Sequence, residues 1–129
     1  MPTTSQNKPS PDINSPPPVD VERLHIVAET DAEKATILEI FFRIAMETMA
    51  ALQTAVSNNN PVQWKKSAHH LKGSAVNLGM NILAQKLERA ETGGEFSPEA
   101  CDSQLQDIAY EIEHVKSYLA FTPGGKTGG

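Results

Sequence analysis

Apolar residues recur along the middle of the chain at steps of three and four, which is the period of an α-helix. No stretch alternates apolar and polar residues as a half-buried β-strand does. The stepped pattern is interrupted by groups of Gly, Pro, Asn and Ser, which commonly mark helix ends and turns. The pattern therefore predicts an all-α chain with short connections.

Two helices are predicted in the first half of the chain. Asp20 is expected to cap a short helix that ends near Glu29, and Thr30 with Glu33 fits a capping box before a helix reaching about Ser57. The short helix is expected to turn inward Val21, Leu24 and Val27 or Ala28. The inward face of the long helix consists of Leu38, Phe41, Ala45, Met49, Leu52 and Val56, widened by Ile37, Ile40 and Ile44.

The next helix is predicted between Asn60 and Gly79. Asn60 suits the cap, Pro61 suits the first helical position, and Gly79 suits the terminator. One stripe is expected to face the core, namely Trp64, Ala68, Leu71, Ala75 and Leu78.

Two further helices complete the pattern. Asn81 is the expected cap of a shorter helix, which "TGGEF" interrupts. Ser97 and Pro98 then start a final helix that Pro123 and Gly124 end. The core positions of these two helices are Leu83, Leu87 and Ala90, then Cys101, Leu105, Ile108, Ile112, Val115 and Leu119. Short connections predict an up-down antiparallel four-helix bundle with a short additional N-terminal helix.

Composition sets the expected limits of the bundle and its surroundings. Residues 1–19 form a disordered Pro/Ser-rich tail, residues 20–121 the bundle and residues 122–129 a flexible Gly-rich tail. The formal net charge of −5 disfavours nonspecific nucleic-acid binding. The single cysteine, Cys101, suits a reducing compartment, and neither a membrane span nor a secretory signal is seen. We expect a cytoplasmic monomer.

The helix expected after Asn60 carries an unusual outward face. Projected at about 100° per residue, His69 points away from the core stripe, with Lys72 and Gly73 beside it one turn on. The same face also holds Val62, Lys65 and Val76. Two valines on a solvent face favour a small docking patch around an accessible histidine, although single exposed apolar residues are common.

Gly73 strengthens this interpretation. A glycine inside a helix costs about 1 kcal/mol relative to alanine, and on a solvent face the fold gains nothing from it. The absent side chain would let another molecule approach the backbone beside His69, whereas the alternative is a local bend or a glycine without a role.

An exposed histidine with a nearby lysine suits phosphoryl transfer. Neutral imidazole is nucleophilic near pH 7, and an ammonium offsets the charge of a bound phosphoryl group. His69 and His70 point about 100° apart and cannot chelate one metal, and no metal-ligand spacing is present.

These residues resemble a known family. "AHHLKGSAVNLG" is similar to the signature A-H-x-L-K-G-S-x-x-x-(I/L)-G of histidine-containing phosphotransfer (HPt) domains. The resemblance extends over about residues 20–120. It implies a four-helix bundle that carries phosphoryl groups between receiver-domain aspartates in multistep phosphorelays.

The resemblance also implies residue roles. His69 would be phosphorylated, Lys72 would assist the phosphoryl group and Gly73 would admit the partner. His70 falls on the variable position and Ser74 on the small one. The residues expected to contact the partner are Val62, Lys65, His70, Ser74 and Val76.

The implied partners are response-regulator receiver domains and a hybrid sensor kinase. No cofactor of its own is expected, because the Mg²⁺ belongs to the receiver, and without an ATP-binding region the chain would be a carrier and not an enzyme. Some members place a Gln and an Arg near the histidine from the following helix, where this chain holds Glu91 and Glu95. The alternative is a helical adaptor that binds a signalling partner without phosphotransfer.

Overall fold

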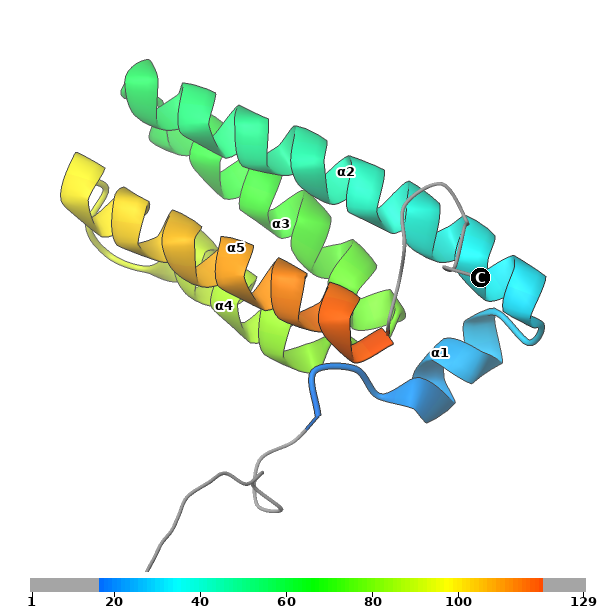
Figure 1. Cartoon of the computed structure of the whole chain (residues 1–129). Helices are drawn as coiled ribbons and strands as arrows, with labels where there is room; N and C mark the ends of the chain where they lie inside the picture. The colour runs from blue at the N-terminus through cyan, green and yellow to red at the C-terminus, as the bar shows by residue number, and fades with distance from the viewer. Residues whose placement is uncertain (1–16, 120–129) are drawn as a thin grey trace, which may run out of the picture.

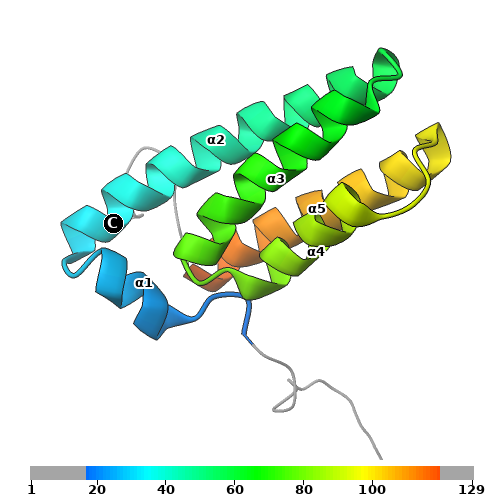
Figure 2. The same ribbon diagram turned by 180° about the vertical axis from the view of Figure 1, so that it is seen from behind.

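The computed structural model describes residues 17–119 as a helical bundle. Within this range the helices are α1 (Val21–Val27), α2 (Asp31–Ser57), α3 (Pro61–Asn77), α4 (Asn81–Thr92) and α5 (Pro98–Leu119), and no strand is present. α2 to α5 lie side by side with alternating chain direction, and α1 lies at the end where α3 finishes and α4 begins (Figures 1 and 2). The predicted up-down four-helix bundle with a short N-terminal helix is confirmed.

The four long helices close into a ring. α3 packs against both α2 and α4, and α5 packs against both α4 and α2. The indole Nε1 of Trp64 donates a buried hydrogen bond of 2.8 Å to the carbonyl oxygen of Ala90, which joins α3 to α4. Because α3 and α4 are held together by core packing and by this bond, the side chains at the edge of their interface have a fixed register.

Most helix starts follow the predicted capping chemistry. Four residues accept backbone N–H groups with their side chains, namely Asp20, Thr30, Asn60 and Ser97. The prediction was wrong for α4: Asn81 is its first helical residue, and Met80 occupies the cap position without a side-chain hydrogen bond. Met80 is fully buried, and its amide donates to the carbonyl of Ala75 over 2.8 Å, a local bond that closes the end of α3.

Gly79 ends α3 and also receives the N-terminal segment. Its φ of 78° lies in the left-handed region that favours glycine. A Cβ atom there would lie 2.8 Å from the carbonyl oxygen of Asp20, whose amide donates to the Gly79 oxygen over 2.8 Å. Arg23 of α1 also donates to the Asn77 carbonyl over 3.0 Å. The prediction of Gly79 as terminator is confirmed, and the same glycine fixes α1 on the bundle.

The core agrees with most of the predicted inward positions, with three corrections. Val21 and Ile40 were predicted inward but are 51% and 42% exposed. Val21 is exposed because α1 buries only its face that contains Leu24, and Ile40 lies beside the buried face of α2. Val19, which composition assigned to the tail, is fully buried. The predicted stop at Pro123 and Gly124 and most of both tails lie outside the described residues.

Candidate functional site

His69 lies on the outer surface of α3, on the side of the helix opposite its buried stripe. Its side chain is 66% exposed. All five predicted stripe residues are buried, namely Trp64, Ala68, Leu71, Ala75 and Leu78. Since a helix that buries this stripe must turn the opposite side outward, the position of His69 follows directly from the apolar pattern.

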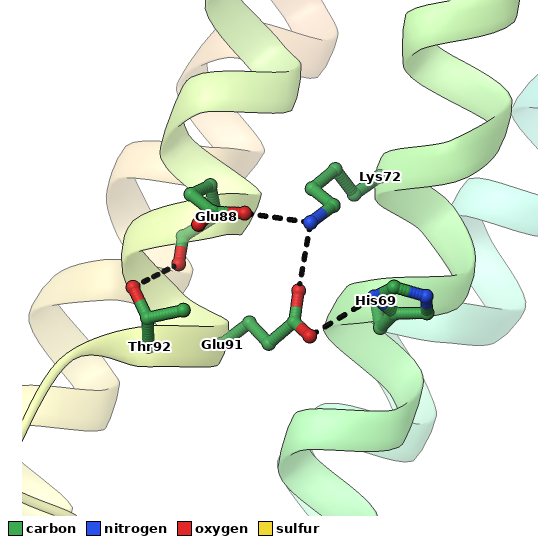
Figure 3. A network of polar contacts seen from close by, with 5 residues as sticks. All are labelled: His69, Lys72, Glu88, Glu91 and Thr92. Atoms are coloured by element: carbon green, nitrogen blue, oxygen red, sulfur yellow. Dashed lines mark hydrogen bonds and ion pairs between the residues drawn. The ribbon is translucent and has the colours of Figure 1, made fainter.

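Glu91 of α4 holds the imidazole of His69 from one side. Its Oε2 atom lies 2.9 Å from Nδ1 of His69 (Figure 3). An ionised carboxylate only accepts hydrogen bonds, so Nδ1 carries the proton and donates. In neutral His69 the lone pair is therefore on Nε2, which Figure 3 shows on the side of the ring away from Glu91.

Lys72 lies one turn after His69 and also reaches across to α4. Its Nζ atom is 2.6 Å from Oε1 of Glu88 and 3.1 Å from Oε1 of Glu91. The antiparallel direction of α3 and α4 explains the pattern, because three residues forward on α3 correspond to three residues backward on α4. His69 thus meets Glu91, and Lys72 meets Glu88 (Figure 3).

These contacts shift two ionisation equilibria. Hydrogen bonds to Glu88 and then to Glu91 raise the pKa of the Lys72 ammonium, and partial desolvation opposes them. Desolvation by itself would raise the pKa of Glu91, but hydrogen bonds from Lys72 and His69 outweigh it and leave that pKa below its ordinary value. The site at neutral pH therefore holds an ionised Glu91 and a charged Lys72.

Gly73 is exposed, and a Cβ atom added to it would find nothing within 4 Å. No described residue of the bundle therefore requires glycine at this position. Among the described glycines only Gly79 has a positive φ, so the backbone conformation at Gly73 does not require glycine either. What Gly73 provides is a bare stretch of helix surface beside His69.

The remaining predicted site residues lie around this centre at different distances. Val62 and Val76 are 67% and 51% exposed, and each is two turns, about 10 Å, from His69 along α3. Ser74 is partly buried. Lys65 and His70 are exposed and line an open groove between α2 and α3, which His69 also borders.

That groove gives the site a second wall. From α2 it is lined by Ile44, Glu47, Thr48 and Ala51. From α3 the lining includes Lys65, Lys66 and His70. A partner over His69 would meet the mixed apolar, acidic and basic groups of this groove, which Glu91 also borders, and the Glu88–Lys72 contact on the α4 side.

Sequence reasoning placed one neighbour of the histidine wrongly and missed another. The resemblance aligned Glu95 with a family position near the histidine, but Glu95 lies exposed in the loop after α4, which ends at Thr92 as the "TGGEF" interruption predicted. Glu88 was missed, although it lies three residues before Glu91 on the same helical face, and this spacing was the available signal. No group of three His, Cys, Asp or Glu within residues 17–119 is arranged to hold a metal ion.

Comparison with known proteins places most of the bundle in one family. The family model of the Hpt domain matches residues 36–118. This range includes α3, α4 and all four residues drawn around His69 in Figure 3. No curated protein matches the chain significantly. Among the described residues, no helix is long and apolar enough to cross a membrane.

Proposed function

Because the chain belongs to the Hpt domain family, whose members are phosphocarriers in phosphorelays, we propose that it carries a phosphoryl group on His69. The donor and the acceptor are aspartates of response-regulator receiver domains, and a hybrid sensor kinase supplies the relay. The observation that supports His69 most directly is its contact with Glu91, which directs the Nε2 lone pair outward.

The transfer is a substitution at phosphorus. Nε2 of His69 attacks the aspartyl phosphate of a receiver, so a P–N bond forms while the acyl P–O bond breaks and the aspartate leaves as a carboxylate. The ring becomes positively charged, because Nδ1 keeps its proton, and the carboxylate of Glu91 stabilises that charge. Transfer to the next receiver reverses these steps, with neutral imidazole as the leaving group.

The surface around His69 suits such a partner. Gly73 leaves room for the receiver's phosphorylated loop, and Val62 and Val76 offer small apolar contacts on either side. Lys65 and His70 in the adjoining groove, with Ser74 near the glycine, complete the proposed contact surface. The carrier brings no cofactor to the reaction, and Mg²⁺ is supplied by the receiver. A carrier must release its partner after each transfer, so the interface is small and transient.

A phosphotransfer assay tests the proposal. Receiver domains are phosphorylated with acetyl phosphate and Mg²⁺, then mixed with the wild-type chain, His69→Gln and the matched neighbour variant His70→Gln. Wild type and His70→Gln become phosphorylated and His69→Gln does not, in a linkage that is labile in acid and stable in base. Labelling of His69→Gln but not of His70→Gln would disprove the assignment. Receiver binding that survives His69→Ala, without any phosphorylation, would indicate an adaptor.

A further inference from the structure

Lys72 is already engaged in the unphosphorylated site. Its ammonium lies 2.6 Å from Glu88 and 3.1 Å from Glu91, and its side chain is only 23% exposed. Figure 3 shows this ammonium turned toward α4, whereas the second ring nitrogen of His69 points away from α4. To bind a phosphoryl group on Nε2, Lys72 must therefore leave at least the carboxylate of Glu88.

The two carboxylates that hold Lys72 differ in their other contacts. Glu91 is 22% exposed and its second oxygen binds His69, so it stays tied to the imidazole when Lys72 moves. Glu88 is 51% exposed, and Lys72 is the only charged partner of its carboxylate among residues 17–119. A released Glu88 carboxylate can be hydrated by solvent at little cost, which makes Glu88 the exchangeable ligand.

We propose that Glu88 is a resting ligand of Lys72 that competes with the phosphoryl group of phospho-His69 for the lysine. The inference rests on the proposed function and concerns the fate of the phosphoryl group. In a site without this competitor, the lysine would pair with the phosphoryl group alone. In this site Glu88 retains Lys72 for part of the time, so the lysine stabilises the phosphoryl group less. Phospho-His69 is therefore shorter-lived, and its phosphoryl group is transferred more readily.

Charge supports the same direction. One ammonium faces two carboxylates in the resting site, and a phosphoryl group adds about two further negative charges. Lys72 is able to make the exchange, because residues three apart lie on the same helical face and a lysine stem is long and flexible. No covalent bond changes in this exchange; one ion pair is replaced by another.

The test measures the lifetime of phosphohistidine without any receiver. The full chain is loaded with phosphoramidate, the reagent is removed, and phospho-His69 is followed at pH 8 by ³¹P NMR. Its resonance is the one absent from His69→Gln. Glu88→Gln is expected to lengthen the half-life about three- to fivefold, the factor that corresponds to an exposed ion pair near the upper end of its usual strength.

Two controls separate competition for Lys72 from general charge effects. Glu95→Gln removes the same charge from the loop after α4, where the exposed Glu95 side chain forms no hydrogen bond or ion pair with a described residue, and is expected to leave the half-life unchanged. In a Lys72→Met background, Glu88→Gln is expected to leave the half-life unchanged, because the ammonium for which Glu88 and the phosphoryl group compete is absent.

Each alternative result overturns the inference. Equal half-lives for wild type and Glu88→Gln mean that Glu88 does not compete. A similar increase of the half-life in Glu95→Gln means that the net charge of the chain alone is responsible. An equally large effect of Glu88→Gln in the Lys72→Met background means that Glu88 acts by direct repulsion of the phosphoryl group. Because loading is chemical, these results do not depend on receivers, whereas failure of every receiver to phosphorylate His69 would reject only the proposed function.

Discussion

A single carboxylate joins the two candidate functional side chains of α3, His69 and Lys72. Oε2 of Glu91 lies 2.9 Å from Nδ1 of His69, and Oε1 of Glu91 lies 3.1 Å from Nζ of Lys72. Glu91 therefore sets the position of the imidazole proton and also helps to hold the ammonium. Effects on orientation, ionisation and stability all follow from this shared contact.

Glu91→Ala is expected to slow phosphorylation of His69 about tenfold, because the lost hydrogen bond to a charged carboxylate corresponds to roughly 1.5 kcal/mol. Without Glu91, both tautomers of the imidazole become populated and part of the population has its proton on Nε2. Two-dimensional ¹H–¹⁵N spectra of the histidine rings measure the tautomer ratio alongside the transfer rate. An unchanged ratio in Glu91→Ala would contradict the positioning role, and Glu95→Ala is the matched control.

The lowered pKa of Glu91 predicts a pH-dependent contribution to stability. The unfolded chain binds this proton near the ordinary value of 4.5 and the folded chain only at lower pH, so the contribution is present above about pH 4.5 and is lost below it. Urea unfolding of wild type and Glu91→Gln from pH 3 to 7 checks the sign. The stability advantage of wild type is expected to shrink as pH falls, and a constant difference over the range would refute it.

The two glycines of the motif, Gly73 and Gly79, are expected to respond oppositely to alanine. Gly73→Ala should raise the free energy of unfolding by up to about 1 kcal/mol, because helix propensity improves and the added Cβ meets open space. Gly79→Ala should lower it by about 2 kcal/mol or more, because φ is 78° and the Cβ would lie 2.8 Å from the Asp20 carbonyl. Chemical denaturation of both variants tests the pair, and destabilisation by Gly73→Ala would show a structural role.

Gly73→Leu is expected to block transfer from a phosphorylated receiver while helix content stays unchanged. The leucine side chain would project from the bare surface beside His69, where the proposed receiver approaches. Circular dichroism and the transfer rate are measured on the same sample. Transfer at the wild-type rate, or loss of the fold, would each show that clearance is not the function of this glycine.

A second ion pair, away from the site, is expected to affect stability alone. Glu111 is 2% exposed, and its Oε1 lies 3.7 Å from Nζ of Lys86. Lys86→Met should lower the free energy of unfolding by about 1–3 kcal/mol, because it leaves a buried carboxylate poorly compensated. The loss should be smaller in a Glu111→Gln background, and the exposed Lys66→Met serves as control. Equal losses in both backgrounds would show that Lys86 does not act through Glu111.

The sequence by itself determined the helices, most of their ends and the outward position of His69. These features depend on contacts between residues only a few positions apart. The Thr30–Glu33 capping box and the buried stripe from Trp64 to Leu78 are readable for this reason. The motif around His69 and Gly73 likewise lies within a few turns of one helix, so its resemblance to the family was visible from the sequence.

Only the tertiary structure decided which residues meet His69 and Lys72. Glu88 and Glu91 are placed by the register between α3 and α4, which core packing and the Trp64–Ala90 hydrogen bond fix. Register between helices arises from the sum of many weak contacts between distant segments, and no local pattern in the sequence records it.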